Sequence, residues 1–415
     1  MRKKSVFINC METLTANRKH SEARTLLNAG LKESAERQTA ATAPAYVLTK
    51  PYVFPAVDGN MTYHTSWGSH GVKEEAETIL SVLSSFCLRS TLVKINQGPR
   101  LTQYVIEPAP GTQVQSVLRR EKEFQAALHC NASLRFDNGY VYIEVPTGTE
   151  TVFLGDMLID NEYQSSSGFT MAIGMAVDGS KHYIDIAKAC HILISGMTGS
   201  GKSIVLHNLI LSLLMKKNPA QMHLYIIDPK ATEFEYYKNL AACTVVSEVN
   251  GAVELLKNLC IEMDRRYSIL ASTGCRDIDS YNTKFADAPM RRDIVFIDEL
   301  SDLMSMGGKS VEGHIVRIAQ KARACGIHLV IATQYPVAKV VTGLIKANMP
   351  TKICLRVGTV TNSMVALDMA GGEKLMGHGD MLFLPNGSLS PVRLQGGFVS
   401  ETAINNVVAG LMKNQ

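Results

Sequence analysis

The chain has 415 residues, 46% of them hydrophobic and 19% charged, which is the composition of a globular protein with two or three domains. No apolar run approaches the roughly 20 residues that span a bilayer, and the basic start lacks the apolar core of a secretory signal, so we expect no membrane segment. Nine scattered cysteines without a Cys-x-x-Cys pair indicate a reducing, cytoplasmic location and argue against zinc, and a net charge of +4 permits nucleic-acid contact without demanding it.

Residues 1–70 are predicted to form a flexible N-terminal region. Basic residues alternate there with Ser, Thr, Asn and Ala, and the helical pattern around 26–31 is too short to be stable alone. Residues 71–160 are predicted to form a small α+β domain. Apolar residues recur at helical spacing over 73–88, and 114–128 is typical of a second helix, whereas 102–110, 132–136 and 140–146 alternate as strands do.

Residues 161–415 are predicted to form a larger α/β domain. From residue 191 onward, short and almost continuously apolar runs alternate with amphipathic helical patterns. The predicted strands are 191–195, 222–228, 293–298, 327–333 and 352–357, and the predicted helices are 203–217, 252–272 and 312–325. This alternation indicates a parallel sheet covered by helices on both faces, and such sheets bind ligands at the carboxyl ends of their strands.

A glycine-rich loop after the first of these strands fits the pattern G-x-x-x-x-G-K-[ST]. Its residues are Gly196, Met197, Thr198, Gly199, Ser200, Gly201, Lys202 and Ser203. Backbone N–H groups of such a loop point at the phosphates of a nucleotide, and the helix that follows presents its positive end to them. Lys202 is predicted to supply a positive charge to the phosphates and the Ser203 hydroxyl to bind Mg²⁺.

Polar residues also close two other predicted strands. Asp298 is predicted to hold the magnesium through water, and Glu299 to polarise the attacking water, which favours hydrolysis. The alternative is an acidic pair that opens a helix. Gln334 follows the strand 327–333, where its amide is expected to contact the γ-phosphate or its water, and an ordinary strand-end turn is the alternative.

Three further charged positions allow more than one interpretation. Asp228 ends the strand 222–228 before Pro229 and Lys230, at the edge where the site is expected. A plain turn explains this residue almost as well as a role in the site does. Arg323 lies at a predicted helix end, where an arginine is most often solvated or caps carbonyl groups. Arg356 is a single charge inside a predicted apolar strand, where burial is costly without a partner, so both a structural and a functional contact are open.

Taken together, these segments resemble the motor of the FtsK/SpoIIIE family of DNA translocases and occur in that family's order over about residues 73–408. The matching segments are GMTGSGKS, IIDPK, EMDRRY, IDELSDLM, IAQKARACGIHLVIATQ, TGLIKANMPTKI, LDMAGGEKLMGHGDML and PVRLQGGF. The upstream segment NQGPRLTQYVIEPAPGTQV resembles the family's strand that opens with a Gly-Pro turn.

The resemblance implies a RecA-like P-loop ATPase preceded by the small α+β domain. It implies that Lys202 and Ser203 bind ATP and Mg²⁺, that Asp298 and Glu299 form the hydrolysis pair, and that Gln334 is the family's sensor. It also matches Arg323 to the arginine that reaches the ATP of a neighbouring subunit. The implied assembly is a hexameric ring of identical subunits that threads double-stranded DNA through a central channel.

Three departures from the family pattern affect these expectations. Tyr335 occupies the place of an arginine in the common Thr-Gln-Arg-Pro segment. No membrane-spanning N-terminal region is recognised, and no winged-helix reader of orienting sequences is expected after GGFVS. We therefore predict an ATP-driven motor on double-stranded DNA without these two family parts. The alternatives are an FtsK-like ATPase that drives protein secretion and a non-motor P-loop switch or kinase.

Overall fold

The computed structural model describes residues 54–57, 71–146, 148, 150–166 and 168–413, so that the predicted flexible region 1–70 lies almost wholly outside the described residues. The small domain contains α2 Val72–Ser85, β1 Ser90–Gln97, β2 Leu101–Pro108, α3 Val114–Leu118, α4 Glu121–Leu128, β3 Ser133–Asp137 and β4 Tyr140–Pro146. The strands of the large domain are β5 Thr170–Ala176, β6 Lys181–Asp185, β7 Ile192–Ser195, β8 Met222–Ile227, β9 Cys243–Val246, β10 Arg292–Ile297, β11 Ile327–Thr333, β12 Thr351–Leu355, β13 Asp380–Leu384 and β14 Val392–Gly396. Its helices are α5 Leu154–Leu158, α6 Asn161–Ser165, α7 Ile186–Ala189, α8 Lys202–Leu214, α9 Val249–Thr273, α10 Ile278–Lys284, α11 Leu300–Lys321, α12 Gly343–Ala347, α13 Val360–Leu367 and α14 Glu401–Met412, with short 3₁₀ turns at Glu235–Tyr237 and Gly372–Lys374.

The small domain is an antiparallel sheet in the order β1-β2-β4-β3, with helices packed against it. Its core joins fully buried side chains from strands and helices, among them Tyr104, Phe124 and Ile143. The single helix predicted over 114–128 is wrong, because the chain forms two helices that are separated at Arg119 and Arg120. The separation allows both α3 and α4 to bury an apolar side chain completely in the same core.

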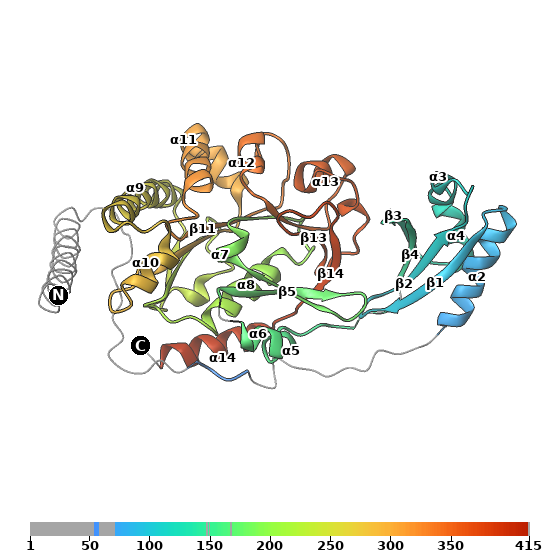
Figure 1. Cartoon of the computed structure of the whole chain (residues 1–415), viewed down its shortest axis with the longest axis horizontal. Coiled ribbons are helices and arrows are strands. Elements are labelled where there is room, and N and C mark those ends of the chain that lie inside the picture. The colour runs from blue at the N-terminus through green and yellow to red at the C-terminus, as the bar shows by residue number, and fades with distance from the viewer. Residues whose placement is uncertain (1–53, 58–70, 147, 149, 167, 414–415) are drawn as a thin grey trace, which may run out of the picture.

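The large domain is built on one ten-stranded sheet in the order β6-β5-β14-β13-β12-β7-β11-β10-β8-β9 (Figure 1). The six strands from β12 to β9 are parallel to one another. Five of them are strands that the sequence predicts, whereas β9 was not predicted. The other four strands extend this sheet in antiparallel pairs, which the sequence patterns did not predict. The domain is therefore α/β with a mixed sheet, in which the parallel part is the majority.

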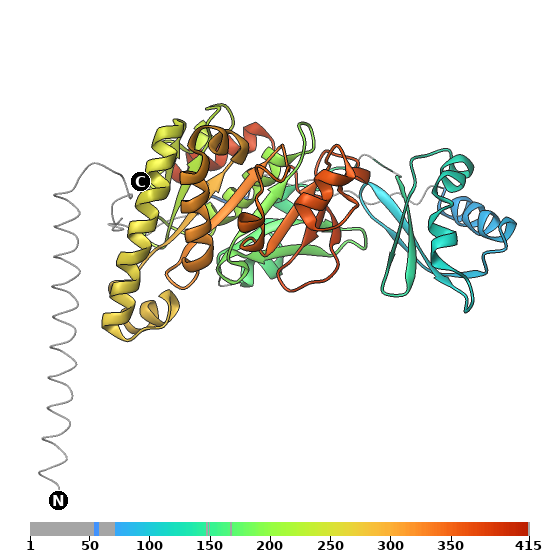
Figure 2. The ribbon, with the colours of Figure 1, turned by 90° about the horizontal axis from the view of Figure 1, so that it is seen from above.

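Both faces of the parallel part are buried, which explains why its strands are apolar at consecutive positions. In β7, Ile192 and Ile194 pack on one face, where α8 and α14 lie, and Leu193 packs on the other, where α9 and α11 lie. Figure 1 shows α9 and α11 above the sheet and α14 below it, and Figure 2 shows the small domain at one end of the molecule.

The connection between the domains belongs with the larger one. Leu154 and Leu158 of α5 are fully buried in the same core as α8 and β5. The boundary predicted near residue 160 therefore lies beyond α5, and the packing favours placing it before Leu154. Among the described residues, no helix has the combination of length and apolar content that crossing a membrane requires.

Candidate nucleotide-binding site

The glycine-rich loop lies where the sequence places it, between the end of β7 and the start of α8. Gly199 and Gly201 have φ angles of 78° and 99°, in the left-handed region that favours glycine. A Cβ on Gly196 would lie 2.6 Å from Ser200 Oγ and 2.8 Å from Leu355 Cβ, so that position has room only for glycine. The glycines therefore allow the tight curve that brings the backbone to the amino end of α8.

Lys202 and Asp298 form a buried ion pair behind this loop. Lys202 Nζ lies 2.6 Å from Asp298 Oδ1 and 2.5 Å from the Asp298 carbonyl oxygen. The side chains are 4% and 3% exposed. The parallel register of β7, β11 and β10 brings these two residues together although they are almost a hundred positions apart. An isolated charge at this depth would be strongly unfavourable, and the pairing compensates each charge.

Glu299 begins α11 as its N-cap and is held by hydrogen bonds on both carboxylate oxygens. Oε1 accepts from the hydroxyls of Ser301 at 2.9 Å and Thr333 at 2.8 Å, and Oε2 accepts from the backbone N–H of Gln334 at 2.9 Å. Glu299 is also 1% exposed. Glu299 therefore does open a helix, as the alternative interpretation holds. The same carboxylate also accepts hydrogen bonds from Thr333 and Gln334 at the end of β11, beside the phosphate loop.

The loop and the start of α8 have three features that suit a phosphate group and a hydrated cation. Helix α8 carries no side-chain cap at its amino end, so its first N–H groups remain directed toward the loop. Ser200 Oγ is buried and has no hydrogen-bond partner among the described residues. Ser203 lies in the first turn of α8, the position from which a hydroxyl reaches a magnesium ion at such loops. The residues present therefore fit a magnesium–nucleotide complex.

Gln334 is in direct contact with the loop. Its Oε1 accepts a hydrogen bond from the Thr198 hydroxyl at 2.7 Å. Tyr335, the residue that departs from the family pattern, is 62% exposed. Gln334 therefore contacts the phosphate loop through its side chain and Glu299 through its backbone.

Arg323 lies far from this site in its own chain. Helix α11 ends at Lys321, and Arg323 lies in the exposed turn that leads into the amino end of β11. The phosphate loop is at the carboxyl ends of the parallel strands, roughly 20 Å away over the seven residues of β11. Arg323 cannot contact the nucleotide site of its own chain from this position.

Arg356 is not a buried strand charge, and that prediction is wrong. Strand β12 ends at Leu355, Arg356 is exposed, and its carbonyl oxygen accepts from the Met197 N–H at 2.9 Å. The reasoning that a charge inside an apolar strand needs a partner applies instead to Arg393 of β14 and Glu144 of β4, which are buried and form an ion pair between the domains. The sequence signal from which this pair could have been found is the single charged residue within each of the strand segments PVRLQG and YIEVP.

Asp228 is a structural residue. It is fully buried, and its carboxylate accepts hydrogen bonds from five consecutive backbone N–H groups, those of residues 230–234, at 3.1–3.3 Å. The aspartate therefore shapes the loop after β8, and the plain-turn interpretation accounts for it.

A mixed, mostly parallel sheet with this loop at its strand ends and a carboxylate pair beside Lys202 defines the RecA-like P-loop ATPase fold. Two family models match the chain: that of the FtsK/SpoIIIE family over residues 154–338 and that of the FtsK alpha domain over residues 59–147. The chain belongs to the FtsK/SpoIIIE family.

Similar proteins support this assignment. DNA translocase SftA of Bacillus subtilis is 39% identical over 86% of this chain, and DNA translocase FtsK of Caldanaerobacter subterraneus is 39% identical over 82%. The chain spans only 39% and 49% of the lengths of these two relatives. The solved structure of the conjugation coupling protein TcpA of pCW3 with ATPγS is 25% identical, with a TM-score of 0.58, over 81% of this chain and 99% of that one.

Proposed function

We propose that the chain is an ATPase motor that moves double-stranded DNA and works as a ring of six identical subunits. The observation that carries the proposal is the constellation of Lys202, Asp298 and Glu299, which come together beyond the carboxyl ends of the parallel strands β7 and β10, on either side of β11. The kinship with proteins named DNA translocases supports the choice of DNA as the substrate.

ATP would bind with its phosphates against the loop of residues 196–203. The backbone N–H groups of the loop and of the first turn of α8 would hold the phosphates, and Lys202 would exchange part of its contact with Asp298 for a phosphate oxygen. Ser203 and Asp298 would hold Mg²⁺, which neutralises charge on the phosphates when bound. The carboxylate of Asp298 already accepts a hydrogen bond from Lys202, which belongs to the loop.

Glu299 would act as the base that polarises the attacking water. Among the described residues its Oε2 accepts one hydrogen bond, from the Gln334 N–H, and a carboxylate oxygen has two lone pairs, so one lone pair of Oε2 is left to accept a proton from water. Gln334 contacts both Thr198 and Glu299. If phosphate binding moves the loop, Gln334 would therefore transmit that movement to Glu299. This linkage supports a sensor role for Gln334.

Arg323 would act on the neighbouring subunit. Its exposed position at the edge opposite the phosphate loop is the place from which a head-to-tail neighbour can be reached in a closed ring. A guanidinium supplied there would stabilise charge on the phosphoryl group during transfer.

The proposal is tested by ATP hydrolysis with and without duplex DNA. We expect duplexes of unrelated sequence to stimulate hydrolysis, and added salt to weaken binding steeply, because a motor without sequence preference contacts phosphates. Lys202→Ala should abolish turnover, and Lys257→Ala, at an exposed position on α9, is the matched control. Turnover that duplex DNA leaves unchanged would reject the DNA motor and favour the secretion or switch alternatives.

A further inference from the structure

A short loop of the large domain, Met376–Asp380, packs behind the phosphate loop. The Gly379 N–H donates to the Ser200 carbonyl oxygen at 2.7 Å, and the His378 N–H donates to the Gly199 carbonyl oxygen at 3.4 Å. A Cβ on Gly201 would lie only 2.6 Å from Gly379 N. A phosphate loop presents N–H groups to its ligand and carbonyl groups to the opposite side, so donors on that side fix the orientation of its peptide planes.

The loop behind the phosphate site has a backbone that needs external support. Gly377, His378 and Gly379 all have positive φ angles, of 87°, 51° and 91°. A non-glycine residue such as His378 is unfavourable in this region, and the conformation persists only when surrounding contacts determine it. Within the large domain, Gln395 Nε2 donates to the His378 carbonyl oxygen at 2.9 Å and Asp380 accepts from the Met376 N–H at 2.7 Å.

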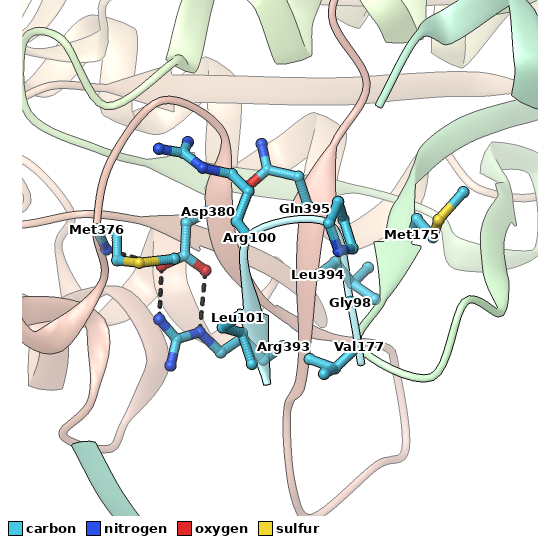
Figure 3. Close-up of a pocket in the computed structure, with 11 residues that line it drawn as sticks. Gly98, Arg100, Leu101, Met175, Val177, Met376, Asp380, Arg393, Leu394 and Gln395 are labelled. Carbon is cyan, nitrogen blue, oxygen red and sulfur yellow. Dashed lines mark hydrogen bonds and ion pairs between the residues drawn. The ribbon is translucent and has the colours of Figure 1, made fainter. Parts of the chain in front are cut away.

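The small domain supplies further support through the turn between β1 and β2. Arg100 Nη1 donates to the carbonyl oxygens of Gly377 at 3.3 Å and His378 at 3.2 Å. Gly98 allows the turn to approach closely, since a Cβ there would lie 2.9 Å from the Val177 Cα after β5. Figure 3 shows the side chain of Arg100 above Asp380 and beside Gln395, with Gly98 close to Val177. This turn contains the Gly-Pro pair of the segment NQGPRLTQYVIEPAPGTQV, to which the sequence analysis assigns no role.

A buried ion network fixes the same two domains one layer deeper. Arg393 donates to both oxygens of Asp380, at 3.0 and 2.7 Å, and pairs with Glu144 of β4 (Figure 3 draws the Asp380 contacts). The neighbouring Arg393 and Arg135 hold the pKa of Glu144 below its usual range in spite of its burial. Asp380 thus anchors one end of the supporting loop to the small domain, while Arg100 contacts its middle.

We propose that Arg100 is a positioning residue for the nucleotide site, through which the small domain holds the loop of residues 376–380 against the back of the phosphate loop. The inference rests on the proposed binding of ATP at residues 196–203. It assigns to the small domain a direct influence on nucleotide affinity, carried by two successive sets of hydrogen bonds from Arg100 to Gly377 and His378, and from Gly379 to Ser200.

The test compares Arg100→Met, Arg100→Lys and the wild-type full chain in binding a fluorescent ATP analogue with magnesium. Met retains the length of the side chain without its donors, and Lys retains a charged donor. We expect Arg100→Met to raise Kd about tenfold, the equivalent of one charge-assisted hydrogen bond, and Arg100→Lys to restore most of the affinity. Hydrogen exchange should rise in peptides that cover 376–380 and 196–203. Arg119→Met, at an exposed arginine of the same domain, is the control.

Each outcome separates this inference from the proposed function. If the wild-type chain binds no nucleotide, or Lys202→Ala binds as tightly as wild type, the proposed function fails. If wild type binds and Arg100→Met binds within twofold of it, with hydrogen exchange unchanged, the role of Arg100 is rejected. A lower melting temperature with unaltered Kd would likewise reject it, because the contact would then be structural only. Should Arg100→Met not fold, Arg100→Gln shortens the side chain so that it no longer reaches Gly377 and His378 but keeps it polar, and unaltered affinity and hydrogen exchange there would overturn the inference.

Discussion

Acidification should destabilise the large domain through two buried histidines at the amino ends of β7 and β11, opposite the phosphate loop. His191 lies at the start of the segment that forms β7, and His328 lies in β11; they are 1% and 0% exposed. The His191 Nδ1 accepts from the Leu329 N–H at 3.0 Å, so a proton on that nitrogen would face another donor. His328 contacts the Cys190 carbonyl oxygen through Nδ1 and the Arg292 guanidinium through Nε2, so its Nε2 must also stay unprotonated.

Burial first, and nearby arginines second, lower the pKa of His191 to about 4 and that of His328 to about 3. Both histidines therefore stay neutral at pH 5, whereas in the unfolded chain they bind protons with a pKa of about 6.5. The unfolded state binds more protons below that value, so stability is lost as pH falls. Between pH 7 and pH 5 the free energy of unfolding should fall by about 1.8 kcal/mol for each histidine.

Urea unfolding followed by far-UV circular dichroism at pH 7, 6 and 5 measures this dependence. In His328→Asn, the fall between pH 7 and 5 should be smaller than in wild type by about 1.8 kcal/mol, whatever the variant's absolute stability. His129→Asn changes an exposed histidine whose φ of 52° asparagine tolerates, and it serves as the control. A dependence on pH that is identical in wild type and His328→Asn would refute the reasoning.

Three further predictions concern the domain contact and the catalytic residues. Arg393→Met leaves two buried carboxylates without their shared partner and should cost about 3–5 kcal/mol in urea unfolding; a loss below about 1 kcal/mol would mean that solvent screens the network. Glu299→Gln should bind ATP with wild-type affinity but hydrolyse it on the order of 10²–10⁴ times more slowly, and normal turnover would exclude it as the base. Arg323→Ala should lose on the order of 10³–10⁵ in turnover and regain part of it when mixed with Lys202→Ala; mixed rings without recovery would remove Arg323 from the mechanism.

Five of the six parallel strands and the phosphate loop could be predicted from the sequence because their signals are local; β9 was missed. Each parallel strand is a short apolar run, and the strand-to-helix setting of the glycine-rich loop places Lys202 without further knowledge. Asp298 follows from the same rule, since all parallel strands end at one edge. The contact between Gln334 and Thr198 depends only on these neighbouring strand ends.

The antiparallel half and the contacts across the domains could not be predicted in this way. β5 and β14 pair although one precedes the phosphate loop and the other follows nearly all of the domain, so no local pattern joins them. The search for a buried strand charge selected Arg356, but β12 ends one residue earlier and leaves that side chain exposed. Arg393 and Glu144 meet only once the two sheets are placed together, and this requires tertiary structure.

The position of β14 has a consequence for how the large domain is made and handled. Leu394 of β14 pairs with Ala176 of β5 on one side and with Met381 of β13 on the other. Until residues 392–396 emerge during synthesis, the β5–β6 hairpin has no neighbour in the sheet and β13 keeps an open edge. Such distant pairing slows folding, and open edges recruit other chains into aggregates. A fragment that ends before Val392 should therefore precipitate, and fragments made for crystallisation should extend through α14, whose buried face covers the same sheet.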